Sequence, residues 1–253
     1  MNLMVTVGPG VAPLVGSALA SLLGWRSIFW LLSAFGLANL VFIWRLLPET
    51  GSTGLNSSAA MLARNYRQLL ISPSFLGYAI GGGCATTSMY AFITSAPFIF
   101  VNQLHRPFHE VGICIAVLVS GVWLGSVLAS RLIARVALER LLVRASAMSV
   151  LAAFVFLGAV LSGHLSMALV IGPMFVFTVG VGIAAPTALT QAVSVNPHVV
   201  GSASGLYGFA QMTVGAACTA LVGLGRDPAL ATAIVLVAAG LIGQLSFWVA
   251  LRR

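Results

Sequence analysis

Residues 145–225 read ASAMSVLAAFVFLGAVLSGHLSMALVIGPMFVFTVGVGIAAPTALTQAVSVNPHVVGSASGLYGFAQMTVGAACTALVGLG, and this stretch decides the fold class. Its 81 residues contain no Asp, Glu, Lys or Arg, whereas about a quarter of an average soluble chain is charged. One membrane-spanning helix needs about 20 apolar residues, so this stretch is long enough to cross a bilayer several times. We therefore expect an all-α, polytopic membrane helix bundle.

Charge in the whole chain follows the same pattern. Of its 253 residues, 60% are hydrophobic and 6% are charged, and all 12 basic residues are arginines. The arginines stand between apolar blocks, where such residues anchor helix ends at the membrane surface. A nucleic-acid-binding groove needs basic residues clustered on a soluble surface, so the net charge of +8 does not indicate nucleic acid. The lipid bilayer is an expected partner, and nucleic acid is not.

Apolar blocks between charges and turn residues predict eight transmembrane helices. Each block is continuous and close to the length of about 20 residues that an α-helix needs to cross a bilayer. The predicted spans are 4–23, 27–46, 74–101, 111–130, 145–162, 166–190, 201–223 and 229–250.

The arginines divide unequally between the two sides of the membrane. If the spans alternate in direction, nine arginines fall on the side of residue 1 and three on the other side. Cytoplasmic loops carry the excess of basic residues, so both termini are predicted to be cytoplasmic. Arg131, Arg135 and Arg140, in the segment SRLIARVALERLL, are interpreted as cytoplasmic anchors. The full set of nine is Arg45, Arg64, Arg67, Arg131, Arg135, Arg140, Arg144, Arg252 and Arg253.

Residues 48–73 form a longer connection than any other between predicted spans. They begin Pro48-Glu49-Thr50, continue through GSTGLNSS and end in the basic amphipathic segment MLARNYRQLL. Gly/Ser-rich segments behave as flexible linkers, and basic amphipathic helices lie at lipid headgroups. We predict a cytoplasmic linker that acts as a hinge between two helix bundles.

A weak internal repeat supports this division. GSALASLLG at 16–24 and GAACTALVG at 215–223 align glycine for glycine, six spans apart. Repeats of six helices are the plan of a major facilitator transporter. Under this alignment, residues 1–47 are the last two helices of an N-terminal bundle, 48–73 the linker and 74–253 the complete C-terminal bundle. The first four helices of that fold are then missing, and activity would need them.

The first predicted span, VGPGVAPLVGSAL, resembles the antiporter motif in the fifth helix of drug-exporting major facilitators. Gly8, Pro9, Pro13 and Gly16 match the Gly/Pro pattern of the motif. Glycines permit close backbone contact, and prolines bend a helix, so we expect this span to pack tightly against another. Three further segments, GWRSIFWLL…LPET, FLGYAIGGG…SAPFIF and PHVVGSASGLYGFAQM, resemble the Bcr/CflA subfamily of bacterial proton-driven multidrug exporters. The resemblance implies a bacterial inner-membrane location and efflux of amphipathic drugs in exchange for protons.

The acidic residues depart from that family pattern. The membrane-embedded Asp of the family's first helix, which is associated with proton coupling, has no counterpart in this chain. Glu49, Glu110, Glu139 and Asp227 all lie at predicted membrane edges or in loops. A proton relay through a bilayer usually needs an ionisable group at depth. We therefore expect the chain as given to be a truncated and inactive portion of an exporter.

Catalytic and metal-binding chemistry has no support in the sequence. Cys84, Cys114 and Cys218 lie inside apolar blocks at spacings unlike those of metal sites, and His105 and His109 lack a third ligand. No nucleophile and base converge. The sequence predicts a protein that is not an enzyme and that uses no cofactor and no metal.

Uncharged polar groups inside the spans are the candidate contacts for a transported molecule. They recur at four-residue spacing on two helices, which places them on common helix faces. One interpretation is a stripe facing a central cavity that holds amphipathic drugs, since aromatic and Met side chains suit varied apolar ligands. The other is hydrogen bonding between helices. The candidates are Thr86, Met89, Tyr90, Thr94, Tyr207 and Gln211.

Drug/proton antiport by alternating access is thus the expected parent activity, with small amphipathic compounds as partners. Two alternatives stay open at this point. The same fold serves in uptake transporters, and a chain without its first helices is also what a non-functional gene fragment would encode.

Overall fold

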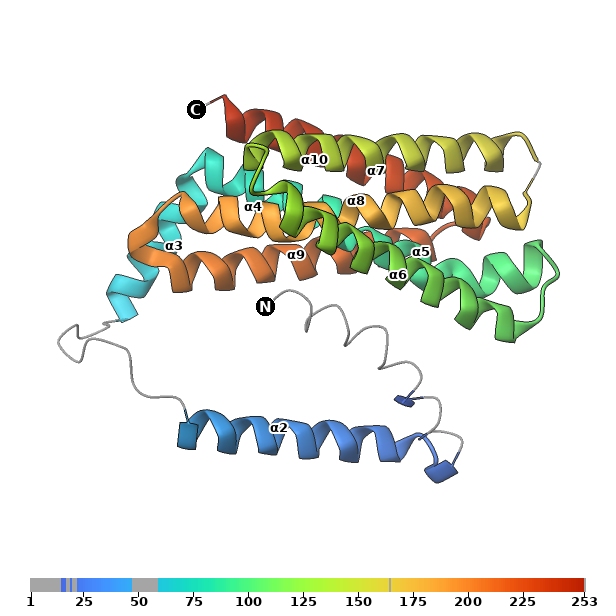
Figure 1. The fold of residues 1–253 in the computed structure, drawn as a ribbon, viewed down its shortest axis with the longest axis horizontal. Helices are drawn as coiled ribbons and strands as arrows, with labels where there is room; N and C mark the ends of the chain where they lie inside the picture. The colour runs from blue at the N-terminus through green and yellow to red at the C-terminus, as the bar shows by residue number, and fades with distance from the viewer. Residues whose placement is uncertain (1–14, 17–18, 20–21, 47–58, 164, 253) are drawn as a thin grey trace.

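The computed structural model describes residues 15–16, 19, 22–46, 59–163 and 165–252, and the regular secondary structure of these residues is entirely helical (Figure 1). Seven of the described helices are long and apolar enough to cross a membrane. This finding confirms the predicted class of an all-α membrane helix bundle. The predicted first span, 4–23, lies largely outside the described residues.

The helix bounds agree with most of the predicted spans to within a few residues. The clearest difference is α7, which begins at Leu138 rather than at 145, because Glu139 and Arg140 extend the helix beyond its apolar block. The elements are α2 (Arg26–Leu46), α3 (Ala59–Ile71), α4 (Pro73–Thr87), α5 (Met89–Phe98), the π-helical turn η1 (Ile99–Gln103), α6 (Phe108–Leu132), α7 (Leu138–Leu161), α8 (Met167–Ser194), the 3-10 turn η2 (Pro197–Val199), α9 (Val200–Gly223) and α10 (Pro228–Leu251).

Two helices begin with a capping residue followed by proline. The Ser72 hydroxyl accepts a hydrogen bond from the Phe75 amide, and Pro73 occupies the first turn of α4. Asp227 caps α10 in the same way, since its Oδ1 accepts hydrogen bonds from the amides of Ala229 and Leu230 at 3.0 and 3.1 Å. Proline suits this position because its missing N–H would have had no helical partner.

Asp227→Ala is expected to lower the free energy of unfolding by about 1 kcal/mol at pH 7, because it removes this cap. The hydrogen bond from the Leu230 amide, and also those from Gln103 and Ala229, lower the pKa of the Asp227 carboxyl from its ordinary value. The stabilisation is therefore present above the ordinary pKa and is lost as the pH falls through the lowered one. Thermal unfolding in detergent at pH 7 and in acid measures it.

Asp227→Asn provides the matched control for that measurement. An amide oxygen still caps the helix but does not titrate, so this variant is expected to lose less stability and to lack the acid-dependent step. A difference between Asp227→Ala and the natural chain that stays constant into acid would contradict the assigned role of the carboxylate.

The predicted span 74–101 is one membrane crossing, but it bends. The hydroxyls of Thr86, Thr87 and Ser88 donate to the carbonyls of the residues four positions earlier, at 2.6, 2.8 and 2.7 Å. Such back-bonding bends helices, and α4 ends here before α5 begins. Pro97 and the π-helical turn η1 interrupt the second half. Hydrophobicity alone does not predict these interruptions of the helix, because every residue in the span is compatible with the membrane.

Glycines bring α6 and α8 into backbone contact. A Cβ atom added at Gly125 would fall on the Val179 carbonyl oxygen and would lie 2.9 Å from the Gly182 Cα. One turn earlier, a Cβ at Gly121 would meet the Thr178 hydroxyl and the carbonyl of Phe175. Gly121 and Gly125 thus form the small-residue face that allows two membrane helices to approach closely.

The linker segment is partly described. Residues 47–58 lie outside the described residues, and the predicted amphipathic segment forms α3, which packs against α4 and α9 (Figure 1). Leu69 anchors this helix, because it is 1% exposed in a core cluster with Phe75 and Tyr78. Most other residues of α3 are exposed. The segment is therefore a helix docked by one side, and its place at lipid headgroups stays a prediction.

Large apolar side chains cover the outside of the molecule. None of the residues of α2 is buried, and Trp30 and Trp44 of this helix are 77% and 82% exposed. Leu245 and Trp248 of α10 are also exposed. A soluble monomer rarely exposes apolar surface on this scale, whereas lipid-facing helices require it. The surface agrees with a multi-pass membrane protein.

Candidate functional site

An open hollow of about 390 Å³ lies among α4, α5, α6, α8 and α9. It sits beside the bend between α4 and α5, where the hydroxyl-rich segment Thr86–Ser88 interrupts the span. Five of the six predicted cavity residues line it, and these five come from two segments more than 100 positions apart in the sequence. They are Thr86, Met89, Tyr90, Tyr207 and Gln211.

Gln211 joins the two polar faces. Its amide Nε2 donates to Thr86 Oγ1 at 2.6 Å. The Thr87 hydroxyl lies 2.9 Å from the backbone carbonyl of Gln211, which ties α4 to α9 a second time. Thr86 and Gln211 therefore form a hydrogen bond between two helices, and both also line the hollow, so the drug-binding interpretation stays a prediction. The carbonyl oxygen Oε1 of the same Gln211 side-chain amide takes no part in this bond.

Tyr207 contributes a buried hydroxyl one helical turn before Gln211. Its side chain is 3% exposed, and its ring lies against Gly82, where a Cβ atom would meet the tyrosine oxygen. The hydroxyl has no hydrogen-bond partner among the described residues. A buried polar group without a partner costs roughly 1–3 kcal/mol.

Tyr90 and Thr94 occupy more open positions on α5. Tyr90 lines the hollow and is 40% exposed, so its ring is accessible from outside the bundle. Thr94, one turn further along, is exposed, does not line the hollow and donates its hydroxyl to the Tyr90 carbonyl. The four-residue spacing predicted Thr94 as a cavity residue, and the structure places it outside the hollow.

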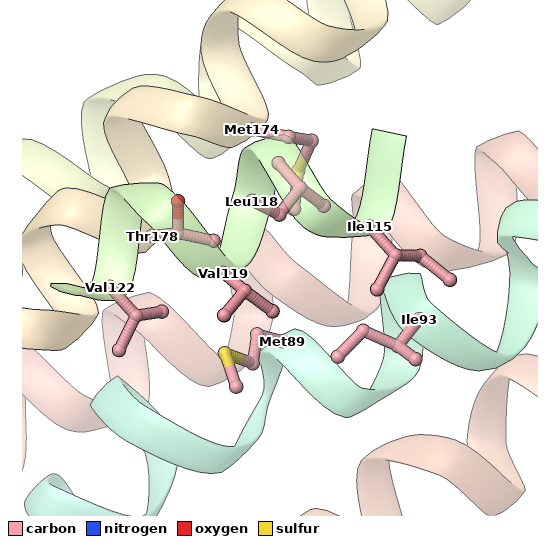
Figure 2. Close-up of a pocket in the computed structure, with 8 residues that line it drawn as sticks. All are labelled: Met89, Ile93, Ile115, Leu118, Val119, Val122, Met174 and Thr178. Atoms are coloured by element: carbon pink, nitrogen blue, oxygen red, sulfur yellow. The ribbon is translucent and has the colours of Figure 1, made fainter. Parts of the chain in front are cut away.

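A small apolar void of about 20 Å³ adjoins the hollow. Figure 2 shows Met89 and Ile93 of α5 on one side of this void and Val119 of α6 on the other. Met89, Val119 and Val122 line both spaces, so they separate the hollow from the void. Met is unbranched and flexible. Met89 is therefore an adaptable apolar side chain between the two spaces.

Several lining residues were absent from the sequence-based candidates. Most are apolar, and apolar residues inside a membrane span give no local sign of which ones face a cavity. One pattern was available, since Val119, Val122 and Ser126 recur at positions that share a face of α6. The lining residues that were not among the sequence-based candidates are Thr87, Val119, Val122, Ser126, Val181, Ala185, Pro186, Leu189 and Met212.

Comparison with known proteins adds to this geometry. Residues 1–220 match a single family of membrane transporters, described as the Major Facilitator Superfamily. This chain belongs to that superfamily. The match confirms the family that the first span and the internal repeat predicted.

Three curated relatives are similar to this major facilitator, and two of them have names that refer to drugs. The multidrug transporter MdfA of Yersinia pestis is 25% identical over 83% of this chain and 52% of its own length. The bicyclomycin resistance protein homolog of Haemophilus influenzae is 26% identical over 88% of the chain and 56% of its own length. The uncharacterized MFS-type transporter YdgK of Bacillus subtilis is 24% identical over 98% and 62%. The chain therefore spans between about half and three fifths of these curated relatives.

The antiporter motif of the major facilitator lies mostly outside the described residues. Gly8, Pro9 and Pro13 belong to the undescribed part. No heavy atom within the described ranges lies within 4 Å of the position that a Cβ at Gly16 would take. Its aligned counterpart Gly215 is different, because a Cβ there would lie 3.0 Å from Thr87. The packing role of the motif stays a prediction.

Charged residues of the described bundle lie at its ends. Arg131 lies in the last turn of α6, Arg135 in the turn that follows this helix, and Arg140 in the first turns of α7. All three side chains are exposed. Glu139 also falls in the first turn of α7. In the part of the chain that the structure describes, no group of three His, Cys, Asp or Glu residues is placed to hold a metal.

Proposed function

We propose that this major facilitator takes part in the efflux of small amphipathic compounds in exchange for protons, by alternating access. The relatives named as a multidrug transporter and a bicyclomycin resistance protein homolog support this direction and cargo. In this proposal, residues 74–253 are one six-helix bundle, and residues 1–47 belong to the other. Alternating access rocks two such bundles around a shared site.

The hollow among α4, α5, α6, α8 and α9 is the observation that carries the proposal. Its volume of about 390 Å³ falls in the range of small-molecule pockets, roughly 300–1,000 Å³. Its wall is mainly apolar, with Thr86 and Gln211 as neutral hydrogen-bonding groups and Met89 as an adaptable apolar one. Such a wall binds the apolar body of a drug by area and orients one polar group.

Cysteine labelling tests this site. In a chain whose three natural cysteines are replaced by alanine, Tyr90→Cys and Gln211→Cys are expected to react with a water-soluble maleimide, because both positions line the hollow. A bound amphipathic dye should slow both reactions. Ser149→Cys is the matched control, since Ser149 is 4% exposed and bonds the Phe177 carbonyl away from the hollow. No reaction at either test position, or reaction that the dye leaves unchanged, would contradict the cavity assignment.

The proposed location is the bacterial inner membrane, with both termini in the cytoplasm. The bundle supports this orientation, because α6 ends, α7 begins and α10 ends at the same end of the molecule (Figure 1). That end carries Arg131, Arg135, Arg140 and Arg252, whereas Arg226 precedes α10 at the other end. Basic residues are enriched on the cytoplasmic side.

Fusions at the C-terminus measure the orientation. A fluorescent protein fused after Arg253 is expected to fold and fluoresce, whereas alkaline phosphatase at the same place is expected to be inactive, because it needs export. Phosphatase fused after Arg226 serves as the positive control, since Arg226 lies on the opposite side in this topology. High phosphatase activity after Arg253 would reverse the topology.

A further inference from the structure

We propose that the groove between α7 and α10 binds an anionic phospholipid at the end of the bundle that holds the C-terminus. This groove has a volume of about 360 Å³ and is separate from the hollow proposed for cargo. Val143 of α7 forms one side, and α10 supplies the other with Leu245, Trp248 and Leu251. The Gln244 amide Nε2 donates to the Val143 carbonyl at 3.1 Å, which holds the floor of the groove together.

The apolar groove has the shape and place that an acyl chain needs. Leu245, Trp248 and Leu251 are all exposed, so the groove is open on its outer side. They occupy the last two turns of α10, which spans Pro228–Leu251. A helix of that length rises about 36 Å, slightly more than the hydrocarbon core of a bilayer. The groove therefore lies in the hydrocarbon layer directly below the headgroups.

Positive charge lies next to the residues that line this groove. The Arg252 guanidinium lies over the Trp248 ring, 3.1 Å from its centroid. Arg140 stands one turn before Val143 on α7, and Arg144 follows Val143 directly. All three arginines are exposed. None of them forms an ion pair with a described residue, and this holds for the nearby Glu139 as well. Three cations at one end of an apolar groove are complementary to an amphipathic molecule with a negative headgroup.

An anionic phospholipid meets each of these requirements. One acyl chain lies in the groove, and the headgroup phosphate is within reach of the guanidiniums of Arg140 and Arg252, which bind phosphate well. A second groove of about 350 Å³ between α4 and α10 shares Leu245 with the first and can accept the other acyl chain. Basic pockets between membrane helices are known to favour anionic headgroups. A zwitterionic lipid would leave the positive charge without compensation.

Native mass spectrometry of the purified, delipidated chain tests the proposal. Dioleoyl phosphatidylglycerol and dioleoyl phosphatidylcholine are titrated separately, so that only the headgroup differs. We expect phosphatidylglycerol to bind more tightly, and Arg140→Gln/Arg252→Gln to weaken it roughly thirtyfold, since each arginine near anionic lipid contributes about fivefold. Arg26→Gln/Arg226→Gln removes the same charge away from the groove and is expected to bind like the natural chain. Arg140→Lys/Arg252→Lys is expected to keep most of the preference.

The possible results separate this site from its alternatives. Equal affinity for the two lipids in the natural chain would overturn the proposal, and this comparison does not depend on any variant folding. The proposal would also be overturned if the Arg140→Gln/Arg252→Gln variant bound phosphatidylglycerol with the same affinity as the Arg26→Gln/Arg226→Gln control. Competition by inorganic phosphate at millimolar concentration would assign the arginines to a free anion, and a dimer in place of lipid adducts would assign the groove to a second copy.

Discussion

Gly125→Ala is expected to lower the stability of the bundle by about 1–3 kcal/mol, the range measured when a packed interior is overfilled. The added Cβ has no room, because it would fall on the Val179 carbonyl oxygen of α8 and lie 2.9 Å from the Gly182 Cα. Both of these are backbone atoms, so no side-chain rotation relieves the overlap. The two helices must move apart, and the contacts along the α6–α8 crossing are lost together.

Gly158→Ala is the matched control for that experiment. It makes the same chemical change inside α7, at an exposed position where a Cβ would have no heavy atom within 4 Å among the described residues. Alanine favours the helix over glycine by about 0.5–1 kcal/mol, so this variant should be as stable as the natural chain or more so. Thermal unfolding in one detergent compares the two. Equal stability of both variants would show that α6 and α8 do not touch at Gly125.

Proteoliposomes that contain only this 253-residue polypeptide are expected to show no dye movement driven by a pH gradient. The reason is the position of the carboxylates. Glu139 lies in the first turn of α7, and Asp227 caps α10, so both stand at helix ends. Glu110 is the third residue of α6, and Glu49 lies in the predicted linker. A proton that crosses the membrane usually needs an ionisable group at depth, and the sequence has no carboxylate inside a predicted span.

The cavity leads to the same expectation. Residues of α4, α5, α6, α8 and α9 line the hollow, all from residues 74–253, whereas alternating access needs two bundles around a shared site. The assay imposes a pH gradient on vesicles and follows a fluorescent cationic dye, with empty vesicles as the baseline. A proton ionophore added at the end verifies that the gradient was held. Dye movement above the baseline that the ionophore abolishes would overturn this expectation and would indicate assembly of several copies.

The sequence by itself determined where the helices lie along the chain. The uncharged stretch 145–225 predicted several spans, and α8 and α9 occupy most of it. The structure begins α4 at Pro73 and α10 at Pro228, within one residue of the predicted spans 74–101 and 229–250. These features are local, because the cost of charge in hydrocarbon and the bonding of a capping side chain depend on residues within one or two turns.

The sequence also identified polar residues inside the spans as candidates for lining a cavity. Thr86 and Gln211 stand out from an apolar background, and their spacing placed each on a helix face. The same rule included Thr94, which the structure places outside the hollow, because periodicity along one helix does not say where a neighbouring helix ends or bends. The hydroxyl back-bonding at Thr86–Ser88 bends the span between Thr86 and Thr94.

Only the tertiary structure decided which faces meet. Gly125 contacts Gly182, and Gln211 bonds Thr86, yet each pair is separated by more than 50 residues of sequence. The apolar lining of the hollow, such as Val119 and Leu189, looks like any lipid-facing residue until α6 and α8 are placed side by side. In a membrane both environments are apolar, so hydrophobicity cannot separate a buried face from a lipid-facing one. Close packing and interhelical hydrogen bonds make that distinction, and they exist only once the helices have assembled.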